Sequence, residues 1–299
     1  LHVCAAYFAD GDTDAYYLRF TGKPRQALIL GNSRAAQGLD PSTLNSLLPV
    51  GLQTDGFFNF SFTIGHSPYG KAYANAIFKK LDPDTRDGVF LLAMDPWSLS
   101  IDNAGRSPND TDLPEDDRFL GRMLTVNMTP NLEYLTRYYP NGWGSLIGGP
   151  LHQERSEVEL MENGWLVTHV AMDSANVALR TQRNLKAYAG HANGGFSIAP
   201  VRMEHLAHLV DHLKAHGTVV LVRMPVHQDM LRLEQGYWPE FSRTMQTFAK
   251  DHDVPFIDHA TLEKDLIFKD GNHLALGSAP VYSQLLADSI IKLYPHWKR

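Results

Sequence analysis

The sequence has only one cysteine, Cys4, so it cannot form an internal disulfide. It also has no long hydrophobic run, because the longest, residues 89–94, is far below the roughly 20 apolar residues that a membrane-spanning helix needs. Basic residues are outnumbered, with 27 Lys and Arg against 33 Asp and Glu, and the formal net charge of -6 repels polyanions. These absences exclude a disulfide framework and a membrane span within this sequence, and they predict no nucleic-acid partner.

What is present is an ordinary globular composition. The 299 residues are 43% hydrophobic and 20% charged, which excludes collagen-like and mostly disordered classes of protein. Single cores stop growing at roughly 250 to 300 residues. We therefore predict one domain over residues 1–299, enlarged by an insertion.

Short apolar runs alternate with helical patterns in the first third of the chain. Residues 26–30 form a β-friendly run that ends in the turn 31–34, and leucines then recur at helical spacing. A second run, residues 57–64, precedes a predicted helix over 72–81. The third run, residues 88–94, is uninterrupted, as is typical of a central parallel strand covered on both faces.

The same alternation returns near the C-terminus, after residues 98–200, which lack it and which we interpret as an insertion after the third strand with a helix near 177–189. The later predicted elements are a helix over 201–215, a strand over 219–223, a helix over 240–250, a strand over 254–257 and a helix over 275–293. Five strands alternating with helices predict an α/β fold, a parallel five-stranded sheet in a three-layer α/β/α arrangement.

Ser33 is the first candidate for chemistry. It lies in a Gly-Asn-Ser turn directly after the first predicted strand, at the carboxyl edge of the sheet, where open α/β folds bind ligands. A serine there is exposed at the start of a helix and can act as a nucleophile. The alternative is that Ser33 is only the N-cap of that helix.

Asp270 and His273 follow the last predicted strand and precede the last helix, so they belong to the same edge. At a spacing of three residues the carboxylate can reach imidazole Nδ1 and leave Nε2 free to take a proton from a hydroxyl. The alternative is an Asx-turn with a neighbouring surface histidine. Together with Ser33, however, these residues have an order compatible with a Ser-His-Asp triad.

On these residues the chain resembles the SGNH (GDSL-like) hydrolase superfamily. Gly31-Asn-Ser33 matches its nucleophile block, Gly65 resembles the glycine of its second block, and Asp270-x-x-His273 matches its last block. The resemblance implies a flavodoxin-like sheet, with Ser33 as nucleophile, His273 as base and Asp270 as the residue that orients it. It also implies an oxyanion hole that uses the backbone N–H groups of Ser33 and Gly65.

The third block of the family departs from this pattern. The strand ends in Met94-Asp95-Pro96, whereas the family has an asparagine that donates to the oxyanion. An ionised Asp95 would repel an oxyanion, so we expect another donor, such as Asn59, Ser67 or a residue of the insertion, or a slow enzyme. Asn32 and Arg223 are further residues that we expect to line the site.

The Asp-Pro-Trp ending, with Arg34 and Arg223-Met-Pro225, is closer to cell-envelope SGNH-like proteins that handle acylated polymers. Because the sequence also starts at Leu1 rather than Met, we expect an upstream signal peptide or single membrane anchor and an extracytoplasmic location. Such an anchor is the only membrane contact that we expect.

The expected function is that of a serine esterase or deacylase. Its substrate would be an ester on an acylated small molecule, a carbohydrate or an envelope polymer, and the chemistry requires no metal and no organic cofactor. Two alternatives stay open at this point. One is an O-acyltransferase that uses the same three residues, and the other is a catalytically inactive carbohydrate-binding module.

Three further patterns carry weaker predictions. We interpret His205, His208, His212 and His216 as one solvated helix face rather than a metal site. The acidic run 109–117 lacks the spaced ligands and central glycine of a calcium loop, so we interpret it as a solvated loop. The insertion is expected to form one wall of the substrate cleft. Tryptophans could line a sugar groove or simply fill the core, namely Trp97, Trp143, Trp165 and Trp238.

Overall fold

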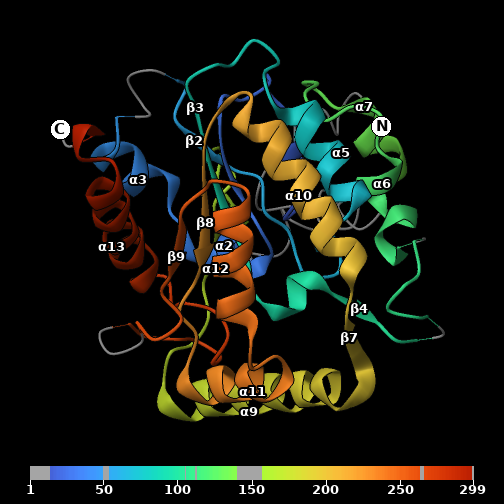
Figure 1. Ribbon diagram of the computed structural model, residues 1–299, viewed down its shortest axis with the longest axis vertical. Helices are drawn as coiled ribbons and strands as arrows, with labels where there is room; N and C mark the ends of the chain where they lie inside the picture. The colour runs from blue at the N-terminus through green and yellow to red at the C-terminus, as the bar shows by residue number, and fades with distance from the viewer. Residues whose placement is uncertain are drawn as a thin grey trace, which may run out of the picture.

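A parallel five-stranded sheet forms the centre of the protein (Figure 1). The computed structural model describes residues 14–49, 54–104, 106–111, 113–139, 157–262 and 266–297. The strand order is β2-β1-β3-β8-β9, and every neighbouring pair is parallel. This is the flavodoxin-like order, so the predicted fold class is confirmed. The strands are β1 (Ala27–Leu30), β2 (Phe57–Asn59), β3 (Gly88–Ala93), β8 (Gly217–Arg223) and β9 (Phe256–Asp258).

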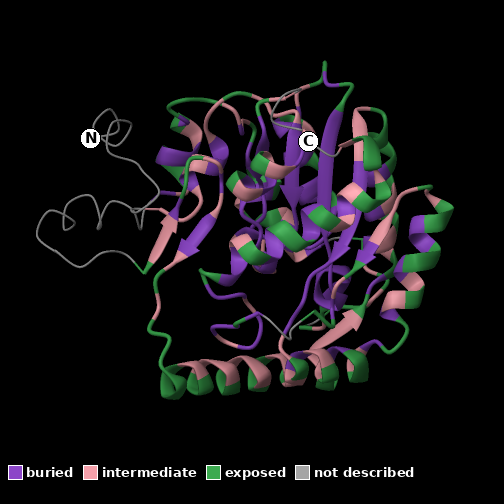
Figure 2. Cartoon of the chain, turned by 90° about the vertical axis from the view of Figure 1, so that its left-hand side faces the viewer, coloured by how far each residue is buried: buried purple, intermediate pink, exposed green. Residues whose placement is uncertain are grey.

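Helices cover both faces of the sheet, so the central strands are buried on both sides (Figure 2). Along β3, Phe90 and Leu92 face one hydrophobic core, whereas Val89 and Leu91 face the other. Complete burial of such a side chain contributes about 1.5 to 3 kcal/mol. The first core is covered by α5 (Lys71–Lys80), α10 (Pro200–Lys214) and α12 (Phe241–Asp251), and the second by α2 (Ser33–Gly38), α3 (Pro41–Leu47) and α13 (Ser278–Leu293).

Strand β2 is shorter than the sequence predicts, because it ends at Asn59 and not at residue 64. Beyond it the chain folds over the end of β1: Phe62 N and Ser67 Oγ both donate to Gly31 O. The side chain of Asn59 also leaves the strand pattern and donates to the carbonyls of Ala35 and Leu39. Side-chain bonds to the backbone therefore end the strand early.

The helix α11 (Gln228–Tyr237) is absent from the sequence prediction. It lies with α9 (Ser174–Gly190) across the carboxyl edge of the sheet, at the bottom of Figure 1. Its two buried residues, Met230 and Glu234, are one helical turn apart and face the protein.

The insertion folds into small elements around the sheet, and α9 and the β5–β6 hairpin belong to the same edge as Ser33, as expected. Its residues 105, 112 and 140–156 lie outside the described residues, and Trp143 is among them. The remaining elements are η1 (Tyr17–Phe20), η2 (Pro96–Leu99), β4 (Ser100–Asp102), η3 (Pro114–Asp117), α6 (Phe119–Arg122), α7 (Leu132–Arg137), β5 (Val158–Leu160), β6 (Leu166–Thr168), η5 (His191–Gly195), β7 (Phe196–Ile198) and η6 (Pro295–Trp297).

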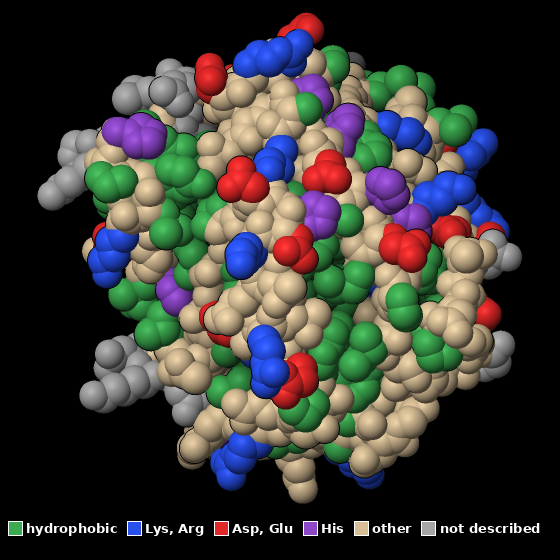
Figure 3. All heavy atoms as spheres, viewed as in Figure 1, with side chains coloured by type: hydrophobic (Ala, Val, Ile, Leu, Met, Phe, Trp, Pro, Cys, Tyr) green, Lys and Arg blue, Asp and Glu red, His purple; other side chains and the backbone are tan. Residues whose placement is uncertain are grey.

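The surface mixes both signs of charge with histidines on the face shown in Figure 3. On α10, His208 and His212 are exposed while Leu206 and Leu209 are buried, so the predicted solvated face is confirmed for these two histidines. It is not confirmed for His205, which is half-buried, or for His216, which lies beyond the end of α10 with its Nδ1 3.1 Å from Thr85 O. None of the helices in the described ranges combines the length and hydrophobicity needed to cross a bilayer.

Candidate active site

The turn after β1 gives Ser33 its exposed position. Gly31 has φ of +149°, and a Cβ there would lie 2.9 Å from Ala93 O and 3.0 Å from Ala35 Cβ, so only glycine fits. Asn32 is the N-cap of α2, since its Oδ1 accepts from Arg34 N at 3.0 Å. The alternative that Ser33 caps the helix is therefore wrong, and the Ser33 hydroxyl is free for another partner.

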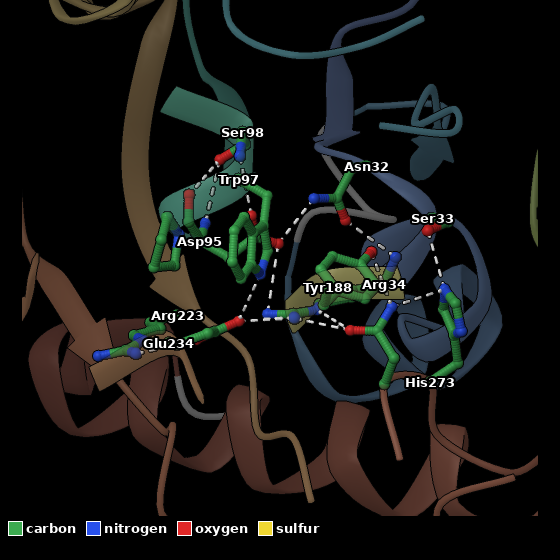
Figure 4. A network of polar contacts seen from close by, with 12 residues as sticks. Asn32, Ser33, Arg34, Asp95, Trp97, Ser98, Tyr188, Arg223, Glu234 and His273 are labelled. Carbon is green, nitrogen blue, oxygen red and sulfur yellow. Dashed lines mark hydrogen bonds and ion pairs between the residues drawn. The ribbon is translucent and has the colours of Figure 1, made fainter. Parts of the chain in front are cut away.

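That partner is His273, which lies 240 positions later in the chain. Ser33 Oγ is 2.8 Å from His273 Nε2, and His273 Nδ1 is 2.8 Å from Asp270 Oδ2. We call these three side chains the serine relay (Figure 4 shows its first two members). The relay is half-buried, with 14% of the His273 side chain and 13% of the Asp270 side chain exposed. The structure thus brings the three sequence-predicted residues together.

Asp270 is held as an anion that orients the imidazole. Burial alone would raise the pKa of its carboxyl group, but the His273 ring and hydrogen bonds from His273 N and Asn272 N together hold this pKa well below the usual range. Because an ionised carboxylate only accepts, Nδ1 carries the ring proton and Nε2 offers its lone pair to the Ser33 hydroxyl. The predicted Asx-turn is also present, but it serves the relay.

A buried ionic network begins at Arg34, directly after the relay serine. Arg34 Nη2 lies 2.6 Å from Glu234 Oε1, Arg34 Nη1 lies 3.4 Å from Asp95 Oδ2, and Arg223 Nη2 lies 3.0 Å from Glu234 Oε2. We call these four side chains the Arg34 network (Figure 4). Burial disfavours the charged guanidinium, but Glu234 and Asp95 outweigh it and raise the pKa of Arg34 above its ordinary value.

Asp95 belongs to this network. Its side chain is 3% exposed, accepts from Asn32 Nδ2 at 2.6 Å and Ser98 N at 2.9 Å, and is paired with Arg34. The charge of Asp95 is therefore compensated and its oxygens are occupied within the network, while its effect on an oxyanion stays a prediction. Asn32 lies between Asp95 and the nucleophile turn, as Figure 4 shows.

Three of the expected lining residues have other tasks. Asn59 is fully buried, and its amide hydrogens are used on the carbonyls that end α2. Ser67 is fully buried too, and its hydroxyl donates to Gly31 O at 2.8 Å. Arg223 pairs with Glu234 on the side of the network away from Ser33. Asn59 and Ser67 therefore use their donors within the fold and are not available to an oxyanion. The expectation that Arg223 lines the site stays a prediction.

Gly65 lies in the turn that packs on Gly31, next to the nucleophile turn. Its carbonyl accepts a hydrogen bond from Arg118, a residue of the insertion that sequence reasoning did not single out. As the first residue of α2, Ser33 has an N–H group without an acceptor in its own helix. An oxyanion hole made from these two N–H groups stays a prediction.

Asn272 connects the Arg34 network to the serine relay, and sequence reasoning missed it although it stands inside the Asp-Gly-Asn-His motif. Its Oδ1 accepts from Arg34 Nε at 2.9 Å and from Arg34 Nη2 at 2.6 Å. Its Nδ2 lies 3.3 Å from both Tyr188 OH and His273 Nε2. The loop that carries His273 is therefore fixed to α2, the helix that begins at Ser33.

The structure also shows where the tryptophans lie and whether acidic, histidine and cysteine side chains gather as metal ligands. Trp97 and Trp238 are buried, and Trp97 Nε1 donates to Glu234 Oε1 at 3.2 Å, so both belong to the interior rather than to a groove. The half-buried Trp165 donates to Gln37 O at 3.0 Å. Within the described residues no group of three or more His, Cys, Asp or Glu side chains is arranged to hold a metal ion.

The acidic run is not simply a solvated loop. Its Glu115 is 1% exposed and pairs with Arg202 at 2.5 Å, while Arg202 Nε donates to Ser100 O at 2.6 Å. Burial of this ion pair attaches the loop to α10. The prediction is therefore wrong at Glu115, and Asp112 lies outside the described residues.

Compared with known proteins, the chain matches no protein-family model and no curated protein. What the fold and the site define by themselves is a flavodoxin-like α/β/α protein with a serine, a histidine and an aspartate in hydrogen-bonding contact at the carboxyl edge of its sheet.

Proposed function

We propose that the protein is a serine ester hydrolase that uses Ser33 as nucleophile. The observation that carries the proposal is the continuous chain of contacts from Ser33 Oγ through His273 to Asp270, with both distances at 2.8 Å. This spacing is that of a hydroxyl, a general base and the carboxylate that orients the base.

In the acylation half, Ser33 Oγ bonds to the acyl carbon while its proton passes to His273 Nε2. The tetrahedral intermediate then collapses, the bond to the alcohol oxygen breaks, and Nε2 returns the proton to the leaving alcohol. Asp270 accepts from Nδ1 throughout and stabilises the charged imidazolium. In the second half, water loses a proton to Nε2, attacks the acyl carbon and releases the acid, and Ser33 regains its proton.

The developing oxyanion needs donors that are in place before the reaction. The N–H of Ser33 is one candidate, because it lacks a partner in α2, and the N–H of Gly65 in the adjoining turn is the second. Removal of one such donor costs about 3 to 4 kcal/mol in transition-state stabilisation. With Asp95, Asn59 and Ser67 occupied elsewhere, the site relies on backbone donors.

For the substrate, we propose an acyl ester on a carbohydrate or envelope polymer, which rests on the family resemblance of the motifs. The experiment is hydrolysis of p-nitrophenyl esters of different chain length and of acetylated sugars by the wild type and by Ser33→Ala. Ester cleavage that is lost in the variant supports the hydrolase, and cleavage of acetylated sugars supports the substrate class. Full activity in Ser33→Ala would contradict the proposal, and acyl transfer to added sugar would reassign the enzyme as a transferase.

A further inference from the structure

A second feature of the same sheet edge is a cavity of about 260 Å³ beside the serine relay. Its lining is mostly apolar, but one charged side chain, Lys269, contributes to it. Lys269 is 5% exposed and directly precedes Asp270 in the chain. The lining residues are Thr168, His169, Val170, Met172, Lys269 and Leu276.

Within the described part of the chain, the ammonium group of Lys269 has only neutral hydrogen-bond partners. Its Nζ donates to Gln37 Oε1 and Thr168 Oγ1, and no carboxylate of the described residues forms an ion pair with it. An ammonium has three donors, so one remains beyond these two hydrogen bonds. A buried charge is normally paired, because loss of hydration costs several kcal/mol. Among the described residues, Lys269 Nζ thus has two neutral hydrogen-bond partners and no carboxylate in contact, next to an open cavity.

The other buried lysine of the described residues, Lys80, shows that this arrangement is not general. Lys80 Nζ donates to Thr21 O at 2.7 Å and Val126 O at 3.1 Å, and it lies 4.8 Å from the centre of the Phe58 ring. Lys80 therefore has carbonyl and aromatic partners within the protein. Lys269 has hydroxyl and amide partners, and it borders a cavity that a ligand can enter.

Two contacts connect the lysine of the cavity to the elements that carry the relay. Gln37, which receives a hydrogen bond from Lys269, stands four residues after Ser33 on α2, so it lies on the same helix face about 6 Å further along. Lys269 N also donates to His273 O at 3.0 Å. Lys269 is thereby fixed to both halves of the relay.

We propose that this cavity is a carboxylate subsite, in which Lys269 binds an anionic carboxylate carried by the ester substrate and the apolar side chains contact its carbon chain. The inference rests on the proposed function for its place in the reaction, and it narrows the substrate class to esters that carry a carboxylate about one helical turn from the scissile bond. Removal of a hydrogen bond to a charged group weakens binding by roughly tenfold or more.

Charged and titratable groups around Lys269 make the subsite pH-dependent. Burial lowers the pKa of Lys269 to about 8, while Asp270 raises it and Arg180 of α9 lowers it. Arg180 Nε donates to Lys269 O at 3.0 Å, and His169 lines the cavity from the end of β6. A carboxylate binds the protonated amine, so its affinity should fall as the pH rises through about 8.

The test measures binding apart from turnover, by titration calorimetry on Ser33→Ala with butyrate and its neutral analogue butyramide. At pH 6.5 butyrate should bind at least about tenfold more tightly than butyramide, and Lys269→Met should remove this difference. The control Lys186→Met, an exposed lysine of α9 with the same change in net charge, should leave the affinity within about twofold. In Ser33→Ala with Lys269 intact, raising the pH from 6.5 to 9.5 should weaken the binding of butyrate at least about tenfold.

Absence of butyrate binding, equal binding of butyramide, or unchanged affinity in a folded Lys269→Met would each overturn the subsite. If Lys269→Met does not fold, the comparison of butyrate binding at pH 6.5 and pH 9.5 replaces it, and an affinity that does not change with pH would overturn the subsite. A kinetic experiment compares a charged ester, mono-p-nitrophenyl glutarate, with a neutral one, p-nitrophenyl pentanoate. The substitution Lys269→Met should lower kcat/KM for the charged ester about tenfold more than for the neutral ester. If the protein binds butyrate but hydrolyses no ester, the proposed esterase function is contradicted and the carboxylate subsite is retained.

Discussion

The serine relay and the Arg34 network start from adjacent residues of α2 but differ in exposure and in how completely their groups are paired. Side chains of the relay residues Asp270 and His273 are 13% and 14% exposed, whereas those of Arg34 and Glu234 are 5% and 1% exposed. In the relay, the Ser33 hydroxyl and His273 Nε2 form a hydrogen-bonding contact between groups without a fixed charge of their own. In the network, every charge has an opposite charge within 3.4 Å.

This difference indicates that the serine relay and the Arg34 network have different tasks, although they start from adjacent residues. Half-buried groups at the edge of the sheet can exchange protons with a ligand, whereas buried charges that are paired with one another hold their neighbours in place. Buried pairs contribute little net stability, but loss of one partner is expensive because the other charge stays buried. We therefore expect substitutions in the relay to affect rate, and substitutions in the network to affect folding.

The largest effect is expected from the relay itself. Ser33→Ala and His273→Ala should each reduce kcat for ester hydrolysis by about 1,000-fold or more, since the nucleophile and its base act as one unit. The double variant should be little worse than either single one. Urea unfolding should show stabilities within about 1 kcal/mol of the wild type, and a multiplicative loss in the double variant would contradict the relay.

The second effect concerns stability. Glu234→Gln leaves Arg34 and Arg223 without their shared counter-charge, so the free energy of unfolding should fall by about 3 to 5 kcal/mol. Urea denaturation followed by circular dichroism measures the loss. The matched control is Glu240→Gln, whose carboxylate pairs with Arg243 at 2.8 Å on the surface and should change stability by less than about 1 kcal/mol. Equal effects of the two substitutions would remove the distinction between network and surface pairs.

Asn272 tests the connection between the two regions. Asn272→Ala leaves two Arg34 donors without their acceptor, which should cost about 1 to 3 kcal/mol of stability. It also frees the loop that carries His273, so kcat should fall several-fold while KM changes little. Asn272→Asp retains an acceptor for Arg34. Compared with Asn272→Ala, it should regain more of the lost stability than of the lost activity. If Asn272→Ala alters KM alone, the residue contacts substrate and does not position the base.

The smallest effect is an acid dependence of stability. The pKa of Asp270 is held below its ordinary value of 3.8 in the folded state, so its contribution is present above about pH 4 and is lost as the pH falls below it. Asp270→Asn should therefore be less stable than the wild type at pH 5, and the gap should shrink by about 1 kcal/mol by pH 3. Denaturant titrations at the two pH values measure it, and a gap that stays constant would contradict this assignment.

The relay was predictable because its residues stand at fixed places relative to strands. Ser33 follows the first strand and Asp270 follows the last, so a parallel sheet brings them to one edge whatever the details between them. The parallel sheet with helices on both faces follows from the alternation of apolar runs and helical patterns, whereas the order of its strands was implied only by the resemblance to the SGNH superfamily. Local sequence pattern was sufficient to predict the relay because residues that follow parallel strands lie at the same edge of the sheet.

The Arg34 network was not predictable in this way, because its contacts join residues far apart in sequence through side chains. Glu234 belongs to a helix that the hydrophobic pattern did not reveal, and the clue would have been its place one turn after the buried Met230. Hydrogen bonds donated by Asn32 Nδ2 and Ser98 N hold the Asp95 carboxylate in the network, which the sequence pattern did not indicate. The early end of β2 likewise depends on Asn59 bonds to α2.

The most direct test of the central claim is covalent labelling with a fluorophosphonate, followed by peptide mass spectrometry. The account predicts one adduct per chain on Ser33, formed at least about 100-fold more slowly in His273→Ala because the base that activates the hydroxyl is absent. Ser67, a buried serine whose hydroxyl is bound to Gly31 O, is the internal control and should remain unlabelled. Absence of a Ser33 adduct, or labelling at the same rate in His273→Ala, would contradict the serine relay as a catalytic unit.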